Sequence, residues 1–320
     1  MNIKQSSYRL LSHEELLEFA REGATKSAEL VIKSHLSLAG ASGKTGLYYD
    51  RNNNEWYQPA GLAPSTHILK QSHVRLKKIV ANEQLCLLTA RKLGIRTPDS
   101  FIINLNDKED DFLFATERYD RKILDTSKEL MGKKVPLRLH QEDFAQALGI
   151  TASQKYEKNG KDYLADVFEL IKNYSSNPIE DQIRLWDLCI FNYLIGNTDN
   201  HVKNIAILYS EDLKGIRLAP AYDLLSTVIY DSSTEKMSLN IDGEYDIRNI
   251  NQKSFENEAK KLGLGKGIAT QHFLSMVEKF EMALEQSTYE LEEQGYGVAV
   301  DIQKQILKKA GIHNFKLTNP

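Results

Sequence analysis

Residues 196–204 have the sequence Gly196-Asn197-Thr198-Asp199-Asn200-His201-Val202-Lys203-Asn204. An apolar helical pattern ends just before this polar stretch, and a strand-like pattern begins at its end. Asp199 and Asn204 are therefore expected on a loop between a helix and a strand. Loops held by rigid elements are where proteins often place groups that bind or react.

Asp199 and Asn204 are five residues apart, which is the spacing of the catalytic loop of protein kinases. In such a loop the Asp takes or orients the proton of the substrate hydroxyl, and the Asn binds a magnesium ion. Both residue types are also common in turns, so the spacing alone indicates a structural turn at least as readily.

Asp223 follows a β-hairpin predicted over residues 204–219, and kinases keep a metal-binding Asp after such a hairpin. The Phe-Gly that usually follows this Asp is absent here. Magnesium prefers hard oxygen ligands and needs few from the protein, so Asn204 and Asp223 would suffice together with phosphate oxygens and water. A helix cap is the alternative for Asp223 taken alone.

A loop of small residues, SLAGASGKT over residues 37–45, is the candidate phosphate-binding segment. Small side chains let backbone N–H groups approach phosphate oxygens closely. A Walker A motif would need a glycine in place of Leu38 and a helix from Lys44, whereas residues 46–49 have a strand pattern. An ordinary flexible turn is the alternative. The predicted nucleotide contacts here are Ser37, Gly40, Ala41, Ser42, Gly43 and Lys44.

Lys70 ends a short β-type run about 26 residues after this loop, which matches the kinase lysine that contacts nucleotide phosphates. Glu83 lies on a helix predicted over residues 79–93 and is the expected ion-pair partner of Lys70. The segment ATERYDR, residues 115–121, closes the strand-rich part of the chain. In a kinase this junction offers backbone groups to adenine.

The predicted fold class is α+β with two lobes, because strand patterns dominate before residue 118 and helical patterns dominate after it. We assign residues 1–118 to the N-lobe and residues 119–320 to a mostly helical C-lobe. Ser12 and Glu15 predict a capping box, and residues 46–58 predict a hairpin. The helices predicted in the C-lobe cover residues 141–148, 164–173, 178–195, 254–262, 270–286 and 298–310.

Composition excludes several classes of protein. The net charge of −3 gives no overall bias toward nucleic acid, and the one basic run, residues 75–78, is interpreted as a solvated helix start. Cys86 and Cys189 lie in apolar helical patterns and are expected to be buried, inert thiols. With no apolar run of membrane-spanning length and no signal-peptide core, a cytoplasmic location is expected; a non-standard secretion signal would escape this test.

Six segments of the chain together resemble the HipA-family kinases, in the same order and with similar intervals. The resemblance extends from about Ser37 to the C-terminal helices. It implies a protein-kinase-like fold with a β-rich N-lobe and an all-helical C-lobe, with ATP and Mg²⁺ as cofactors. The segments are SLAGASGKTGL, STHILK, ATERYDR, RLHQEDFAQALG, GNTDNHVKN and LAPAYDLLS.

The resemblance also implies roles for single residues. Ser37 corresponds to the loop serine that the family autophosphorylates, whereas Ala39 stands where HipT-type proteins can carry a second such serine. The implied roles are catalysis for Asp199, magnesium binding for Asn204 and Asp223, phosphate contact for Lys70 and His201, adenine contact for Glu117 and Tyr119, and a polar position at the nucleotide pocket for Gln141.

Only about 36 residues precede the candidate phosphate loop, too few for the N-terminal subdomain of HipA, and this favours the HipT type of three-gene HipBST systems. The resemblance then implies a HipS-like small protein and a HipB-like DNA-binding antitoxin as partners. It implies a protein substrate, with an aminoacyl-tRNA synthetase expected, and neither direct nucleic-acid nor membrane binding.

The predicted function is a serine/threonine protein kinase toxin of a bacterial toxin–antitoxin system, which transfers the ATP γ-phosphate to a protein hydroxyl and autophosphorylates. A kinase of the same fold that acts on a small molecule or lipid is one alternative. A catalytically silent module that binds partners is another, although the set Lys70, Asp199, Asn204 and Asp223 argues against silence. A P-loop NTPase is a third, and Leu38 at the position of the required glycine argues against it.

Overall fold

The computed structural model describes residues 6–22, 43–71, 78–106, 111–157 and 160–316. The chain divides into two compact units. The first comprises residues 1–84 and 98–139, and the second comprises residues 85–97 and 140–320. The lobe boundary placed at residue 118 stays a prediction, and by their contacts residues 119–139 group with the first unit.

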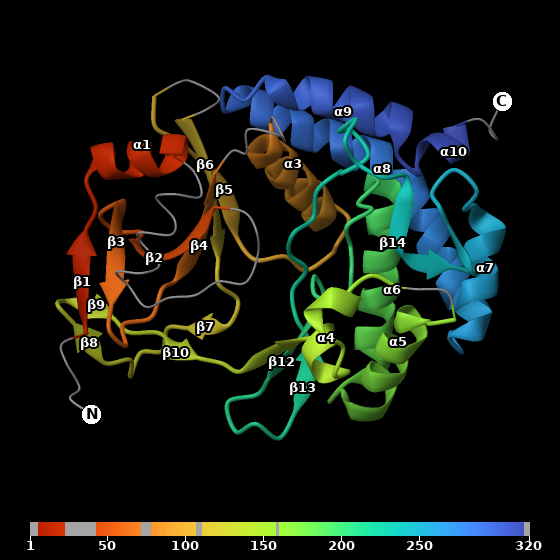
Figure 1. The fold of residues 1–320 in the computed structure, drawn as a ribbon, viewed down its shortest axis with the longest axis horizontal. Coiled ribbons are helices and arrows are strands. Elements are labelled where there is room, and N and C mark those ends of the chain that lie inside the picture. The colour runs from red at the N-terminus through yellow and green to blue at the C-terminus, as the bar shows by residue number, and fades with distance from the viewer. Residues whose placement is uncertain (1–5, 23–42, 72–77, 107–110, 158–159, 317–320) are drawn as a thin grey trace. The chain divides into compact units, whose positions relative to one another are not determined.

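The first unit contains a six-stranded sheet with the strand order β1-β3-β2-β4-β6-β5 (Figure 1). All five neighbouring pairs are antiparallel. The strands are β1 (Ser7–Leu10), β2 (Lys44–Asp50), β3 (Glu55–Ala60), β4 (His67–Gln71), β5 (Ser100–Asn104) and β6 (Phe112–Glu117). Lys70 lies on β4, which has a neighbour on each side.

Helix α1 (His13–Glu22) packs its apolar side against this sheet. Phe19 joins Trp56, Leu69 and Leu113 in one buried cluster. The predicted capping box is confirmed, because the Glu15 N–H donates to Ser12 Oγ and the Ser12 N–H donates to Glu15 Oε2. Two otherwise unpaired donors of the first turn are thereby satisfied.

The hairpin predicted over residues 46–58 is confirmed as β2 and β3, with Tyr49 opposite Trp56. Two small ladders that the sequence patterns did not predict lie in residues 121–138. Their strands are β7 (Arg121–Lys122) with β10 (Leu137–Arg138), and β8 (Glu129–Leu130) with β9 (Lys133–Lys134). The Lys133–Asp50 ion pair and the hydrogen bond from the Tyr48 hydroxyl to the Lys134 carbonyl join this segment to the rest of the first unit.

Helix α3 (Ile79–Lys92) belongs to the first unit up to residue 84 and to the second from residue 85. Gly94 follows its end with φ +84°, a conformation that glycine adopts without a steric penalty. Cys86, on α3, and Cys189 are both buried, as predicted.

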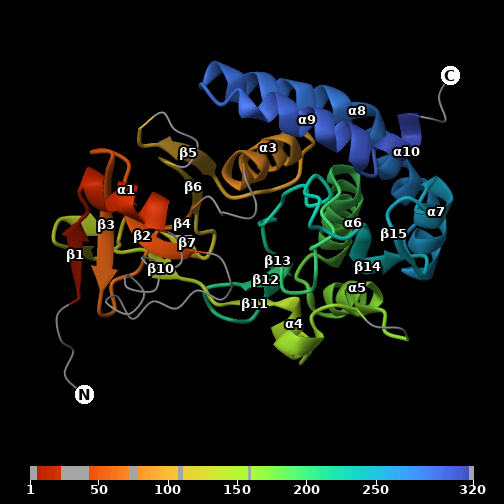
Figure 2. The ribbon, with the colours of Figure 1, turned by 45° about the horizontal axis from the view of Figure 1, so that its top comes forward.

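The second unit is mainly helical, and helix α6 packs against α5 and α8 (Figure 2). From Leu185 to Ile195 every side chain of α6 except that of Asp187 is buried, so this helix is part of the core. The helices are α4 (Phe144–Ala147), α5 (Tyr163–Tyr174), α6 (Pro178–Ile195), α7 (Gln252–Lys261), α8 (Lys266–Glu293), α9 (Val298–Lys309) and α10 (His313–Lys316), with a 3₁₀ turn at Ala152–Gln154. Helix α6 has the predicted bounds.

Strands also occur in this unit. The predicted hairpin is confirmed as β12 (Ala206–Tyr209) and β13 (Ile216–Leu218), and β11 (Gln141–Asp143) adds a third strand beside β12. A second pair, β14 (Lys236–Ile241) with β15 (Glu244–Asp246), was not predicted.

The helix predicted over residues 141–148 is wrong in its first turn. Asp143 caps α4 by accepting a hydrogen bond from the Gln146 N–H, so the helix begins only at Phe144. The three residues before it pair with β12 instead. No helix in the described ranges is both long enough and apolar enough to span a membrane.

Candidate active site

The loop after α6 starts at Gly196, which ends the helix with φ +69°. A Cβ at this position would lie 2.3 Å from Val228 Cγ2 and 3.0 Å from Ala310 Cβ. Glycine is therefore required here both by the backbone angle and by the space available. The close approach fixes the point from which the loop departs.

Backbone and hydroxyl bonds tie the loop to the segment around Thr227. The Thr198 N–H donates to Thr227 Oγ1 over 2.7 Å, and the Thr227 N–H donates to the Gly196 carbonyl over 3.0 Å. Ser238 Oγ on β14 donates to the Thr198 carbonyl over 2.6 Å. Residues 196–198 are thus held from two sides, just before Asp199.

Asp199 is exposed at the tip of this loop. The His201 N–H donates to its carbonyl over 2.9 Å, and Asn204 Nδ2 donates to the same carbonyl over 3.0 Å. The loop between Asp199 and Asn204 is therefore folded back on itself. Because the amide nitrogen of Asn204 is engaged, its Oδ1 is the atom suited to a cation.

Asp223 has a positive φ of +52°, which is uncommon for a residue with a side chain. Asn197 Nδ2 donates to its carbonyl over 3.3 Å, and the neighbouring Tyr222 hydroxyl donates to the Lys203 carbonyl over 3.0 Å. The second bond holds Tyr222, which precedes Asp223, against Lys203, which precedes Asn204. Backbone strain of this kind persists where the surroundings enforce it, and functional sites are common places for it.

The chemistry of Asn204 and Asp223 fits a magnesium ion. They offer an amide oxygen and a carboxylate oxygen, the hard ligands that Mg²⁺ prefers, and two protein ligands leave positions for phosphate oxygens and water. The described residues contain no cluster of three or more His, Cys, Asp or Glu side chains suited to a metal. A closed, all-protein metal cage is thus absent from that part of the chain.

His201 is buried beside Asp199, and burial lowers its pKa below the ordinary value of 6.5. Burial outweighs the nearby Asp199 carboxylate, which raises this pKa, and the smaller effect of the Lys155 ammonium acts in the same direction as burial. Lys155 Nζ lies 2.8 Å from His201 Nε2, so a neutral imidazole accepts this bond and carries its proton on Nδ1. That Nδ1 is buried and has no hydrogen-bond partner among the described residues.

The sequence interpretation missed Tyr156, whose hydroxyl donates to Asp199 Oδ1 over 2.8 Å. It also missed Lys155, which contacts both His201 and the Tyr156 ring. Both residues lie in a polar stretch with no periodic pattern. Tyr156 is 43 residues before Asp199. No local signal could have placed them at the loop.

In the first unit, Lys70 Nζ lies 2.7 Å from Glu83 Oε1, so the predicted ion pair is formed. The two side chains are only 17% and 6% exposed. A buried ion pair needs good geometry to offset desolvation, and Lys70 also lies over the Phe114 ring at 5.5 Å. The role of Lys70 in binding nucleotide phosphates stays a prediction.

Lys44 lies directly opposite Lys70 on the adjacent strand β2. Two like charges at paired positions repel each other, and an anion beside them relieves the repulsion. Lys44 begins a strand rather than a helix, which contradicts a Walker A motif as expected. Of the other predicted loop contacts only Gly43 is described. Ser37, Gly40, Ala41 and Ser42 lie outside the described residues.

The predicted adenine-contact residues lie where β6 ends. The Glu117 N–H donates to the Asp99 carbonyl and the Arg118 N–H donates to the Thr66 carbonyl, so neither N–H remains for a ligand. The Glu117 side chain pairs with Arg51. Adenine would therefore need carbonyl groups here or groups from Tyr119 onward.

Gln141 begins strand β11 in the second unit, paired with Leu208. Asp199, Asn204, His201 and Asp223 lie in this same unit, and the structure brings them together. Lys44, Lys70, Glu83 and Glu117 lie in the first unit.

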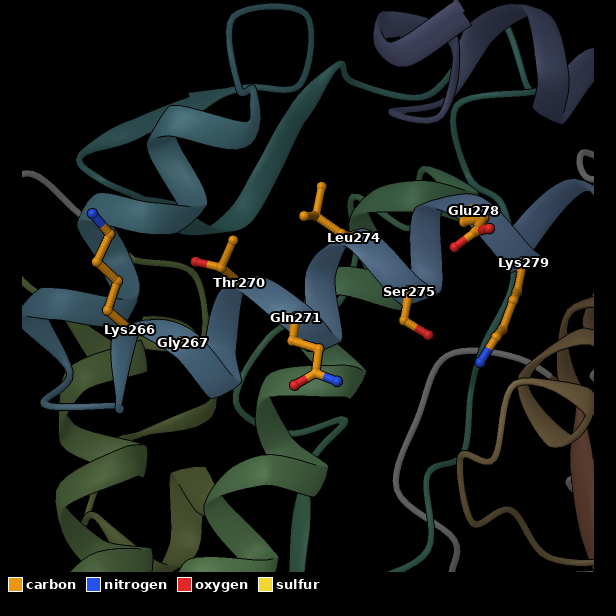
Figure 3. A pocket seen from close by; sticks show the side chains of 8 residues that line it. All are labelled: Lys266, Gly267, Thr270, Gln271, Leu274, Ser275, Glu278 and Lys279. Atoms are coloured by element: carbon orange, nitrogen blue, oxygen red, sulfur yellow. The ribbon is translucent and has the colours of Figure 1, made fainter.

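A hollow of about 740 Å³ lies elsewhere in the second unit, along one side of α8 (Figure 3). All eight lining residues come from residues 266–279 of this single helix, so the hollow is an open surface groove. None of the predicted site residues lines it, and we assign it no part in the chemistry.

These features define a protein-kinase-like fold whose second unit carries the catalytic-loop pattern. The chain belongs to the HipA-like C-terminal domain family, whose model matches residues 36–286. It is similar in structure to HipA of Shewanella oneidensis, solved in complex with HipB and its operator DNA. The TM-score is 0.74 at 23% sequence identity, over 96% of this chain and 72% of that chain. The α+β, kinase-like fold class is thereby confirmed.

Two sequence relatives carry kinase names. The chain is 33% identical over 243 residues to the predicted kinase Y4mE of Sinorhizobium fredii, covering 76% of this chain and 54% of that protein. It is 28% identical over 263 residues to the serine/threonine-protein kinase toxin HipA of Shewanella oneidensis, covering 79% and 57%. The chain thus spans a little over half the length of these two relatives.

Proposed function

We propose that this chain is an ATP-dependent kinase that transfers the γ-phosphoryl group to a serine or threonine hydroxyl of a protein. The observation that carries the proposal is the exposed carboxylate of Asp199 on a loop whose backbone is fixed on both sides. Asn204 is hydrogen-bonded to the Asp199 carbonyl, and the Asp223 carbonyl is held by Asn197 of the same loop. The family membership and the kinase names of the relatives support the same reaction.

In this proposal Asp199 orients the acceptor hydroxyl and accepts its proton while the oxygen attacks the γ-phosphorus. Asn204 and Asp223 hold Mg²⁺, which supplies positive charge to the phosphate oxygens. Lys70, held by Glu83, and Lys44 neutralise further phosphate charge. Most of the catalysis is then positioning and electrostatic stabilisation, as is usual for phosphoryl transfer.

The experiment that tests the proposal is incubation of the purified protein with γ-labelled ATP, Mg²⁺ and a bacterial lysate. The expected result is one or a few labelled proteins that contain phosphoserine or phosphothreonine. Label on lipid or on small molecules would instead support the alternative kinase. Nucleotide binding without any transfer would support the silent binding module.

We further propose that the kinase is the toxin of a toxin–antitoxin system, of the HipT type. The expected protein target is an aminoacyl-tRNA synthetase. The expected partners are a HipB-like antitoxin and a HipS-like small protein. The HipB-like partner is supported by the similar HipA chain, which was solved with HipB. Co-purification with the products of neighbouring genes tests this, and purified neighbours that do not bind would contradict it.

Autophosphorylation at Ser37 is a third part of the proposal and rests on the family resemblance of the loop sequence. A phosphoserine adds roughly −1.5 to −2 charge, which would repel ATP phosphates from this loop. Mass spectrometry after incubation with ATP and Mg²⁺ should find phosphate on Ser37, together with weaker ATP binding. Unchanged ATP affinity of the phosphorylated form would contradict the proposed self-inhibition.

A further inference from the structure

A segment of the second unit, residues 151–157, lies against the catalytic loop through two neighbouring side chains. The Tyr156 hydroxyl donates to Asp199 Oδ1 over 2.8 Å, within the reach that a proton acceptor needs. Lys155 Nζ contacts His201 Nε2 over 2.8 Å. The Tyr156 ring meets the His201 imidazole edge-on, with centroids 5.4 Å apart.

The segment is anchored on both sides of Tyr156, so this contact is built into the fold. Before it, the Gln154 carbonyl accepts a hydrogen bond from the Tyr163 hydroxyl over 3.1 Å. After it, Glu157 Oε2 accepts from the Asn240 N–H and the Asn240 side chain, over 2.9 and 2.6 Å. These bonds hold the backbone, and Tyr156 can leave Asp199 by a change of side-chain rotamer alone.

We propose that Tyr156 fills the acceptor-hydroxyl position of this site, so that a substrate serine or threonine binds only by displacing it from Asp199. This rests on the proposed function, since the acceptor position is defined by the role of Asp199. The phenol makes the contact that a substrate hydroxyl would make in the same reaction. Tyr156 is therefore an intramolecular competitor of the substrate and marks where the substrate segment binds.

Several properties suit Tyr156 to this role. It is 47% exposed, so its side chain has room to swing into solvent. Burial, together with the hydrogen bond to Asp199, raises its pKa to about 12, which keeps the proton on the phenol and the hydrogen bond in place. The cation of Lys155 lies 4.7 Å from the ring centroid and favours the same rotamer.

The test compares the wild-type chain with Tyr156→Phe, using dephosphorylated casein as the protein acceptor and water as the acceptor in casein-free ATP hydrolysis. The substitution removes only the hydroxyl and keeps the ring contacts with Lys155 and His201. A matched control is Tyr174→Phe, which removes a phenol hydroxyl from a residue of the same unit that is 70% exposed.

We expect Tyr156→Phe to raise kcat/KM for casein roughly two- to tenfold, the range that one net hydrogen bond contributes, mainly through a lower KM. The KM for ATP should not change, casein-free hydrolysis should rise, and Tyr174→Phe should behave as wild type. An unchanged or lower kcat/KM with Tyr156→Phe would overturn the inference, because Tyr156 would then be inert or would position Asp199. If wild type transfers phosphate neither to casein nor to water, the proposed function itself fails, and this inference fails with it.

Discussion

Two aspartates near the ends of helix α6 have opposite surroundings. Asp181, in the first turn, is fully buried, and its carboxylate accepts hydrogen bonds from the Ser175 hydroxyl, the Leu218 N–H and two arginines. Asp199, four residues after the helix, is exposed. In the described part of the chain its carboxylate has one side-chain donor, Tyr156.

The difference separates a structural acid from a candidate catalytic one. A carboxylate whose lone pairs are all used stabilises the fold and has none left for a substrate. Asp181 joins α6 to β13 through Arg217, and so helps to hold the hairpin that follows the catalytic loop. Asp199 can still accept further hydrogen bonds. Its loop is held by backbone and threonine contacts of the preceding residues instead.

Apart from substitution of Asp199 itself, the largest effect is expected from Asp223→Asn, which keeps the side-chain size and a residue type that tolerates positive φ. Loss of the carboxylate charge weakens the magnesium site. A metal contributes several kcal/mol to such transition states, so we expect phosphoryl transfer to fall by roughly 10³-fold. Initial rates at saturating ATP and Mg²⁺ measure this, and near-normal turnover of a folded variant would remove Asp223 from the site.

A smaller loss, roughly 10²-fold, is expected for Lys70→Met, because one positioned donor to the phosphates is removed. Glu83→Gln should lose less, since an amide still holds the Lys70 ammonium. Lys133→Met is the control: Lys133 is a part-buried lysine of the same unit that pairs with Asp50 over 2.5 Å. Kinetics in which the Lys70 and Lys133 variants lose activity equally would refute a phosphate role for Lys70.

Asp181→Ala should affect stability rather than chemistry. Breaking a buried pair usually costs about 3–5 kcal/mol, and we expect roughly 3 kcal/mol because Arg217, one-third exposed, can still be solvated. Urea unfolding at pH 7 measures the loss. Activity at temperatures well below unfolding should be kept, and a variant as stable as wild type would erase the contrast between the two aspartates.

The smallest predicted effect concerns how the stability contributed by Asp181 depends on acid pH. Burial raises the pKa of Asp181, but hydrogen bonds from Arg217, Ser175 and the Leu218 N–H outweigh it and hold the pKa below 3.8. A depressed pKa gives stability that is present above pH 3.8 and is lost as the pH falls through the folded value. The difference in unfolding free energy between wild type and Asp181→Ala should therefore shrink below about pH 3.8. A difference that is constant down to pH 2 would contradict this.

Local signals predicted much of the fold. Ser12 with Glu15, the polar turn of the β2–β3 hairpin and the apolar run of α6 each act over a few residues, and the structure contains all three. The Lys70–Glu83 pair was also predicted, because strand and helix order placed the two side chains.

Contacts distant in sequence could not be predicted. Gln141 to Asp143 pair with β12, more than 60 residues away, and this pairing overrides their helical pattern. Tyr156 reaches Asp199 across 43 residues from a stretch with no periodicity. The capping signal of Asp143 with Gln146 was present in the sequence and would have placed the start of α4 correctly.

The role of Asp199 as the functional carboxylate is tested by the rate of γ-phosphoryl transfer by Asp199→Asn, measured at the same folded fraction as wild type. Asp231→Asn is the control, since this aspartate of the same unit has a fully exposed side chain paired only loosely with Lys309. We expect Asp199→Asn to lose roughly 10²–10⁴-fold in kcat, the contribution of a general base, while its urea midpoint stays at the wild-type value. A folded Asp199→Asn protein that transfers phosphate as fast as the Asp231→Asn control would contradict it.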